Sequence, residues 1–143
     1  MQIQTINKIK ELTDNRKQLF TEYLTITQKL TDLKEEDVEQ ITAEMEQRAA
    51  LAEQIDDLGI QSRKVCRADG REEHLTEILQ CRADFSLLSE EEKELFSLCQ
   101  SVNRILLEIQ DQEVLVTGIL RTSGINSRNP YTGTIQGRNS RVI

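Results

Sequence analysis

The fold is decided by a stretch near the C-terminal end of the chain, residues 89–122, which read SEEEKELFSLCQSVNRILLEIQDQEVLVTGILRT. Ser89 with Glu92 three residues later forms a capping-box sequence, and the neighbouring glutamates place negative charge at the positive end of a helix dipole. Apolar side chains then recur in alternating steps of three and four. They lie at Leu95, Leu98, Val102, Ile105, Ile109, Val116 and Ile119, and the one polar residue in this series is Gln112. The stretch predicts an amphipathic helix over residues 90–122, roughly 50 Å long at about 1.5 Å per residue.

A second stripe of this kind lies at the N-terminal end and predicts a helix over residues 3–33. Its positions are Ile9, Leu12, Arg16, Leu19, Tyr23, Ile26, Leu30 and Leu33. The stripe is widened by Ile6, Phe20 and Leu24, as in a bundle helix that packs against more than one neighbour. We expect Arg16 to run along the seam and reach solvent with its guanidinium. Arg16 and Gln112 are polar residues within otherwise apolar stripes. An alternative interpretation is that they fix the register between neighbouring helices or mark where a partner docks.

The connection that follows, LKEEDVEQI at positions 33–41, contains no Gly or Pro. Asp37 with Gln40 is a capping-box-like start and predicts a second helix over residues 37–67. Its apolar face is expected at Val38, Ile41, Met45, Ala49, Ala52, Ile55 and Leu58, with Leu51 beside it. A reversal near residues 34–36 pairs the two helices as an antiparallel hairpin, which leaves less apolar surface in water than the alternative, one continuous helix of about fifty residues.

The segment between Gly59 and Ser89 carries weaker signals. We expect the second helix to continue past Gly59 toward Cys66, at a local cost of roughly 1 kcal/mol for the glycine. The dipeptide Asp69-Gly70 favours a turn, and Asp69 is in position to cap a short helix within residues 70–80.

The composition favours one all-α domain. Of 143 residues, 37% are hydrophobic, 3% are aromatic, 30% are charged and one is proline, which is close to the profile of long helices. The chain has the usual length of a single domain. The sequence therefore predicts an elongated antiparallel three-helix bundle or helical hairpin with coiled-coil-like seams over residues 1–122.

Charge is divided unevenly along the chain. All 25 acidic residues but only 15 of the 18 basic residues lie in residues 1–122, which gives this part a net charge of −10. Such an acidic body argues against nucleic acid as a partner, because phosphate binding requires basic clusters. No apolar run approaches the roughly 18 residues of a membrane span, and the first residues lack the apolar region of a signal peptide. We expect no membrane insertion and a cytoplasmic location.

The last part of the chain, SGINSRNPYTGTIQGRNSRVI at positions 123–143, contains no acidic side chain. It carries the three remaining basic residues, Arg128, Arg138 and Arg141. Its composition predicts a flexible, disordered tail, because too little apolar surface is present to offset the cost of ordering it. The tail nevertheless holds isolated apolar positions, at Ile125, Tyr131, Ile135, Val142 and Ile143.

Signals for catalysis or cofactor binding are weak. The lone histidine, His74, stands among glutamates on what we expect to be a solvated short helix, and no phosphate loop or nucleophile motif is present. The cysteines, Cys66, Cys81 and Cys99, have zinc-compatible chemistry together with His74, but they lack the paired spacing of a zinc site. We expect reduced thiols, with Cys99 as a small core residue, and neither an enzyme nor a metal or cofactor.

The pattern of a leading amphipathic helix, a second helix with an acidic start, a long third helix and a polar tail with a tyrosine resembles the FlgN family of flagellar type III export chaperones. In that family the second helix opens with an acidic turn such as Gly-Asp and apolar residues, followed by a basic residue and a leucine. Here Glu36-Asp37-Val38-Glu39-Gln40-Ile41 and Arg48-Ala49-Ala50-Leu51 are similar to that pattern, without the glycine. The resemblance covers residues 1–122.

The resemblance implies a cytoplasmic chaperone that binds the C-terminal helical segments of hook-associated, or hook-filament junction, proteins. It also implies that the chaperone prevents their premature polymerisation and delivers them to an export-gate component. A client helix would lie in a groove of the body, and the tail would fold over it. The candidate partner-binding residues are Val102, Ile105, Ile109, Val116, Ile119, Leu120, Ile125 and Tyr131.

A different class of function fits the same heptads. If the helices of residues 3–33 and 90–122 pair between chains, the protein is a homo-oligomeric coiled-coil scaffold or adaptor, with a homodimer as its simplest form.

Overall fold

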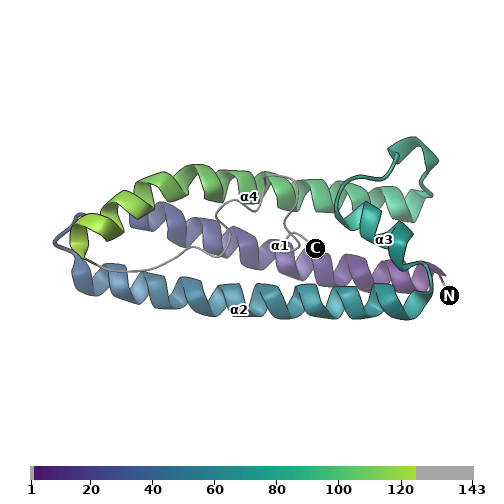
Figure 1. Ribbon diagram of the computed structural model, residues 1–143, viewed down its shortest axis with the longest axis horizontal. Helices are drawn as coiled ribbons and strands as arrows, with labels where there is room; N and C mark the ends of the chain where they lie inside the picture. The colour runs from purple at the N-terminus through teal and green to yellow at the C-terminus, as the bar shows by residue number, and fades with distance from the viewer. Residues whose placement is uncertain (1, 125–143) are drawn as a thin grey trace.

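The structure is a computed structural model that describes residues 2–124. Its elements are α1 (Gln2–Thr31), α2 (Val38–Asp69), α3 (Glu72–Leu79), the short 3-10 turn η1 (Phe85–Leu87) and α4 (Glu90–Ser123). Within this part of the chain there is no strand. Three long helices lie side by side in an elongated body, and α3 covers one end (Figure 1). The predicted all-α class is confirmed, and the helix ends lie within two residues of those predicted.

The chain runs up, down and up through the bundle. It reverses between α1 and α2, so these two form the expected antiparallel hairpin rather than one continuous helix, and α4 returns parallel to α1 (Figure 1). The backbone of α1 lies close to both α2 and α4, whereas α2 and α4 approach each other through side chains. The helix α1 is therefore the central element of the bundle.

Two of the three predicted caps differ in the structure. The Ser89–Glu92 capping box forms in full, with the Ser89 Oγ accepting from the Glu92 N–H and the Glu92 carboxylate accepting from the Ser89 N–H. Asp37 stands at the N-cap position of α2 as predicted, but its side chain makes no capping bond: the Asp37 carboxylate accepts from the N–H of Lys34 at 2.9 Å and so closes the turn before the helix. Asp69 does not cap α3 either, because it is the last residue of α2 and accepts from the Arg71 side chain.

The core consists of two clusters, one toward each end of the rod. The larger cluster contains Phe20, Tyr23, Leu24, Ile26, Leu30, Ile41, Leu51, Ala52, Ile55, Val102, Leu106, Ile109, Val116 and Leu120. The smaller one, beneath α3, contains Ile6, Ile9, Cys66, Leu75, Ile78, Leu79, Leu88, Leu95, Phe96 and Cys99. Leu19, Leu33, Met45, Ile105 and Ile119 pack at the edge of the larger cluster and are partly buried. The short helix α3, predicted only loosely, thus closes one end of the core.

The buried faces of α2 and α4 are turned relative to the predicted stripes. On α2, Ala49 and Val38 are exposed, whereas Arg48 is buried. On α4 the buried seam is Leu95, Cys99, Val102, Leu106, Ile109, Glu113, Val116 and Leu120. At every second predicted position of the α4 seam, the buried residue is the next one along the chain. Cys99, Leu106, Glu113 and Leu120 are buried where Leu98, Ile105, Gln112 and Ile119 were predicted. The polar residue in that seam is Glu113 rather than Gln112, because Glu113 pairs with Arg48.

Arg16 is buried, contrary to the expectation that it reaches solvent. Its Nε donates to the backbone carbonyl of Ile55 on α2 at 3.1 Å, and its guanidinium lies 5.4 Å from the centre of the Phe20 ring. The Ile55 carbonyl and the Phe20 ring give the buried guanidinium favourable contacts in place of those it would make with water. Arg16 thus joins α1 to α2.

Candidate partner-binding surface

The outward face of α4 carries an apolar surface, here named the α4 patch and made up of Leu107, Val114, Leu115, Gly118 and Ile119. Val114 is 75% exposed, Leu115 58% and Leu107 44%. Residues spaced by three, four or seven positions share one face of a helix, and these spacings link Leu107, Val114, Leu115 and Gly118. Large apolar side chains gathered on one exposed face are characteristic of a binding surface, whereas scattered ones are ordinary.

A shallow hollow is formed by most of the patch residues, between the end of α4 and the α1–α2 connection. It is lined by Glu35, Val114, Leu115, Gly118, Ile119 and Thr122. Gly118 helps to form it: a Cβ at this position would find no atom within 4 Å, so the missing side chain leaves open space. The hollow therefore offers apolar walls and one carboxylate at its rim.

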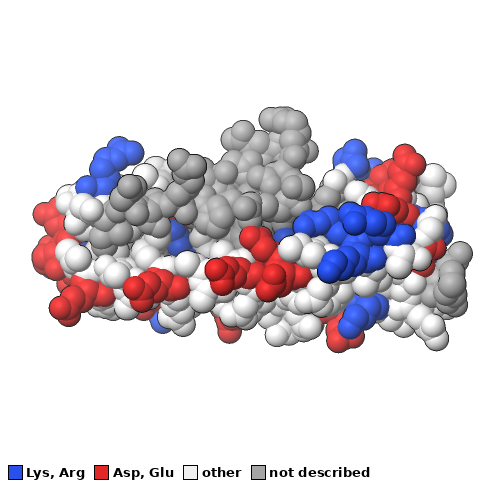
Figure 2. Space-filling model, turned by 60° about the horizontal axis from the view of Figure 1, so that its bottom comes forward, with Lys and Arg blue, Asp and Glu red and all other residues white. Residues whose placement is uncertain are grey.

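Charged side chains of both signs border the patch, and the acidic ones are more numerous: Arg104 and Arg121 are exposed on α4, three residues from Leu107 and Gly118. Glu108 and Asp111 are exposed on α4 within one turn of Leu107 or Leu115, and Asp32, Glu35 and Glu36 are exposed in or beside the α1–α2 connection. Figure 2 shows acidic side chains predominating at this end of the molecule, with a basic group toward the other end. A partner for this surface should combine apolar side chains with positive charge.

Beneath the patch, a buried polar cluster joins all three long helices. The Arg48 guanidinium donates to both carboxylate oxygens of Glu113, at 3.0 and 3.2 Å, and to Thr27 Oγ1 at 3.2 Å. It also stacks 5.0 Å from the centre of the Tyr23 ring. Arg48 and Glu113 are almost fully buried, so this pair is shielded from solvent.

The Arg48–Glu113 pair fixes how α4 is rotated about its axis. Successive residues of a helix are turned by about 100°, so Leu115 points away from the side on which Glu113 meets Arg48. The same cluster raises the pKa of Tyr23 above its ordinary value, because burial outweighs the opposing charge of Arg48, and Glu113 adds to the rise. The Tyr23 hydroxyl therefore stays protonated at neutral pH.

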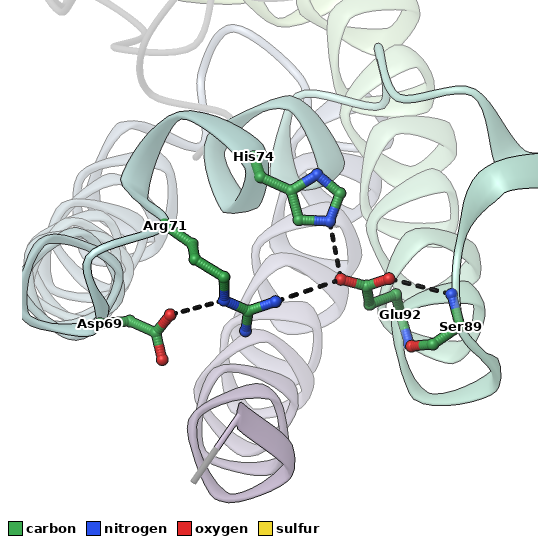
Figure 3. A network of polar contacts seen from close by, with 5 residues as sticks. All are labelled: Asp69, Arg71, His74, Ser89 and Glu92. Atoms are coloured by element: carbon green, nitrogen blue, oxygen red, sulfur yellow. Dashed lines mark hydrogen bonds and ion pairs between the residues drawn. The ribbon is translucent and has the colours of Figure 1, made fainter.

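A second polar network ties α3 to the ends of α2 and α4 (Figure 3). One oxygen of Glu92 lies 2.7 Å from His74 Nε2 and 3.6 Å from Arg71 Nη1, while the other accepts from the Ser89 N–H at 2.9 Å. Arg71 also donates to Asp69 at 2.8 Å and so links Glu92 to the end of α2. Burial acts to raise the pKa of Glu92, but the hydrogen bonds from Ser89 and His74 hold it below its ordinary value. His74 is half-exposed, yet it serves as a bridge between α3 and α4.

The predicted partner-binding residues fall into three groups. Four of them, Val102, Ile109, Val116 and Leu120, are buried in the larger core cluster and hold α4 to the bundle, which is a correction to their placement on a binding face. Ile105 and Ile119 are partly buried, and Ile119 lines the hollow. Ile125 and Tyr131 lie outside the described residues.

Sequence reasoning missed Leu107, Val114 and Leu115 as the exposed apolar residues. The signal was present as a second apolar stripe along α4, offset from the seam and sharing a face with Gly118. The predicted stripe followed the seam positions alone, because periodicity does not show whether a second set of apolar positions meets a neighbouring helix or solvent.

The cysteines are free thiols. Burial raises the pKa of Cys66 to about 11, with the nearby charges of Glu72 and Asp69 adding to the rise. Burial likewise raises the pKa of Cys81 and Cys99. Cys99 lies in the smaller core cluster as expected. Across residues 2–124, no group of three or more His, Cys, Asp and Glu side chains is arranged to hold a metal ion.

Comparison with known proteins found no matching family model, no similar curated protein and no similar solved structure. Among the helices of the described part, none combines the length and the apolar character needed to cross a bilayer.

Proposed function

We propose that this protein is a helical binding protein that holds an amphipathic helix of a partner against the α4 patch. By its resemblance to the FlgN family, we propose that it acts as a cytoplasmic export chaperone. Its clients would be the C-terminal helical segments of hook-filament junction proteins, kept from premature polymerisation and delivered to the export gate.

The observation that carries this proposal is the exposed apolar face of α4 formed by Leu107, Val114 and Leu115. An amphipathic helix binds such a face by burying side chains spaced at i, i+3, i+4 and i+7. Fully burying one Leu or Val side chain stabilises a complex by roughly 1.5–3 kcal/mol before the costs of association are subtracted. A few such side chains suit a complex that must later release its client.

A homo-oligomeric scaffold is supported less well. That alternative requires the heptad seams of α1 and α4 to pair between chains. In the structure these seams are buried within one chain, where Tyr23, Ile109 and Val116 lie in a shared core. Self-association would have to use the α4 patch instead, which makes it a competing outcome for the same surface.

Calorimetric titration of the full chain with peptides of the C-terminal helical segments of junction proteins tests the proposal. We expect one-to-one binding that weakens about tenfold, or 1.4 kcal/mol, in Leu115→Lys. The matched control is Leu87→Lys, which changes an 80% exposed leucine at the opposite end of the rod and should leave affinity unchanged.

Two results would contradict the proposal. One is equal weakening by both lysine variants, which would show that the α4 patch is not the site. The other is absence of peptide binding together with a dimer in light scattering that Leu115→Lys dissociates, which would identify a second copy of this chain as the partner.

A further inference from the structure

We propose that, in the free protein, the segment of residues 125–143 occupies the α4 patch of its own chain and competes there with the client helix. The effect on client binding rests on the proposed function, whereas the docking of the segment on the patch does not. Its position, its reach and its charge support this inference.

The position of the segment follows from how α4 ends. The helix finishes at Ser123, and Gly124 adopts a left-handed conformation, with φ of 80°, that ends the helix. Thr122, two residues before Gly124, lines the hollow together with Gly118 and Ile119. Residues 125–143 therefore begin beside the hollow, at the end of the rod where α1 and α2 are connected (Figure 1).

The reach of the segment is sufficient. Its 19 residues span at most about 68 Å when extended. The patch runs from Ile119 back to Leu107, a distance of roughly 18 Å along a helix that rises about 1.5 Å per residue. The segment can thus cover the whole patch without being stretched.

The chemistry of the segment complements the surface. It has three arginines, Arg128, Arg138 and Arg141, and no acidic residue. The exposed carboxylates that border the patch, which include Glu35 and Asp111, outnumber the exposed guanidinium groups of Arg104 and Arg121 beside them.

The spacing of the apolar residues fits as well. Ile125, Tyr131 and Ile135 are separated by polar residues, so each supplies a single apolar side chain that can bury part of the patch. A tethered segment also experiences an effective concentration in the millimolar range, so that a contact too weak to matter between separate molecules is substantially occupied within one chain.

Docking of the segment reduces the apparent affinity for a client. A patch that is free in only about a tenth of molecules binds its client about tenfold more weakly than a patch that is always free. Docking of the segment on the patch therefore lowers client affinity. The sequence-based expectation is the opposite: a tail that folds over a bound client adds contacts to it and raises client affinity. The two roles are separated by whether weakening the segment raises or lowers client affinity.

Photo-crosslinking of the full chain without any client tests the docking itself. A benzophenone amino acid is placed at position 115 in the patch, and crosslinked peptides are mapped by mass spectrometry. The control position is Gln40, which is exposed near the start of α2 at the same end of the rod. We expect crosslinks from position 115 to residues 125–143 at least about tenfold more often than from position 40, as the tethered contact predicts. High salt should reduce this preference.

Equal crosslinking from the two positions, or none from position 115 to the segment, would overturn the proposal. Mixing isotopically labelled and unlabelled protein adds a second check. Crosslinks that join labelled to unlabelled chains would show that a second copy, and not the chain's own segment, covers the patch.

The competitive effect is measured with the junction-protein peptides and a full chain carrying Arg128→Gln, Arg138→Gln, Arg141→Gln and Tyr131→Ser. We expect its client affinity to rise about tenfold, as removal of the internal competitor requires. A fall in affinity would refute competition and favour the clamp. If no junction-protein peptide binds either chain, the proposed function fails, and the crosslinking result alone decides the docking.

Discussion

Replacing Arg48 with Met should destabilise the protein more than almost any other single change. The substitution keeps the volume of the side chain but removes both bonds to Glu113, the bond to Thr27 and the contact with the Tyr23 ring. A hydrogen bond to a charged group contributes roughly 1.5–3 kcal/mol, and a cation–π contact about 0.5–2 kcal/mol. Glu113 would remain 5% exposed without its cationic partner. We expect Arg48→Met to lower the free energy of unfolding by about 3–5 kcal/mol, the range for breaking a buried ion pair from one side.

The double variant Arg48→Met with Glu113→Leu separates the charge effect from the packing effect. Replacing both partners with apolar residues removes the cost of burying either charge, so its stability should return to within about 1 kcal/mol of the original protein. Urea unfolding followed by circular dichroism gives the free energies of unfolding of the original protein, Arg48→Met, Glu113→Leu and the double variant, which together form a double-mutant cycle. If the single variant loses less than about 1 kcal/mol, or the double variant is no more stable than the single one, the pair does not hold α2 and α4 together as argued.

Three further changes probe the rest of the molecule. Because the pKa of Glu92 is lowered on folding, the ionised carboxylate stabilises the protein above the ordinary pKa of 4.5, and this contribution is lost as the pH falls through the pKa of the folded state. The difference in free energy of unfolding between the original protein and Glu92→Gln should therefore shrink as the pH is lowered from about 5. A difference that stays constant with pH would contradict this. Ile109→Ala removes a fully buried side chain and should cost about 2–5 kcal/mol in urea unfolding, with a loss below about 1 kcal/mol refuting its central place in the core. Cys81 is partly buried, whereas Cys66 and Cys99 are buried, so a thiol reagent should modify Cys81 first in the native protein and the other two only on unfolding; simultaneous reaction of all three would show that the smaller core cluster opens.

The sequence predicted the elements well because each has a local cause. The Ser89–Glu92 capping box starts α4, and the three-and-four spacing identifies α1 and α4, so their bounds follow from short-range physics. The rotation of each helix was predicted less well. It depends on which polar residue finds a partner on another helix, and the pairing of Arg48 with Glu113 joins positions 65 residues apart. No local pattern contains that information.

The candidate site shows the same limit. Val102, Ile109, Val116 and Leu120 look like binding residues in the sequence because they are apolar, but this same property buries them against α1 and α2. The exposed apolar residues, Val114 and Leu115, differ from them in position around the helix rather than in type. Their role emerges only when the neighbours of α4 are in place.

The parallel pairing of α1 with α4 has a consequence for synthesis of the chain. The two helices that contact each other are separated by α2 and α3, so α1 reaches its partner only when residues 90–123 have emerged. At about 5–20 residues per second, the ribosome takes roughly 5 to 18 seconds to add the chain between the end of α1 and the end of α4. During this interval the apolar side of α1 that will meet α4 can be covered only by another part of the chain or by another molecule. A nascent chain stalled before α4 is therefore the form of this protein most exposed to aggregation and to capture by general folding factors.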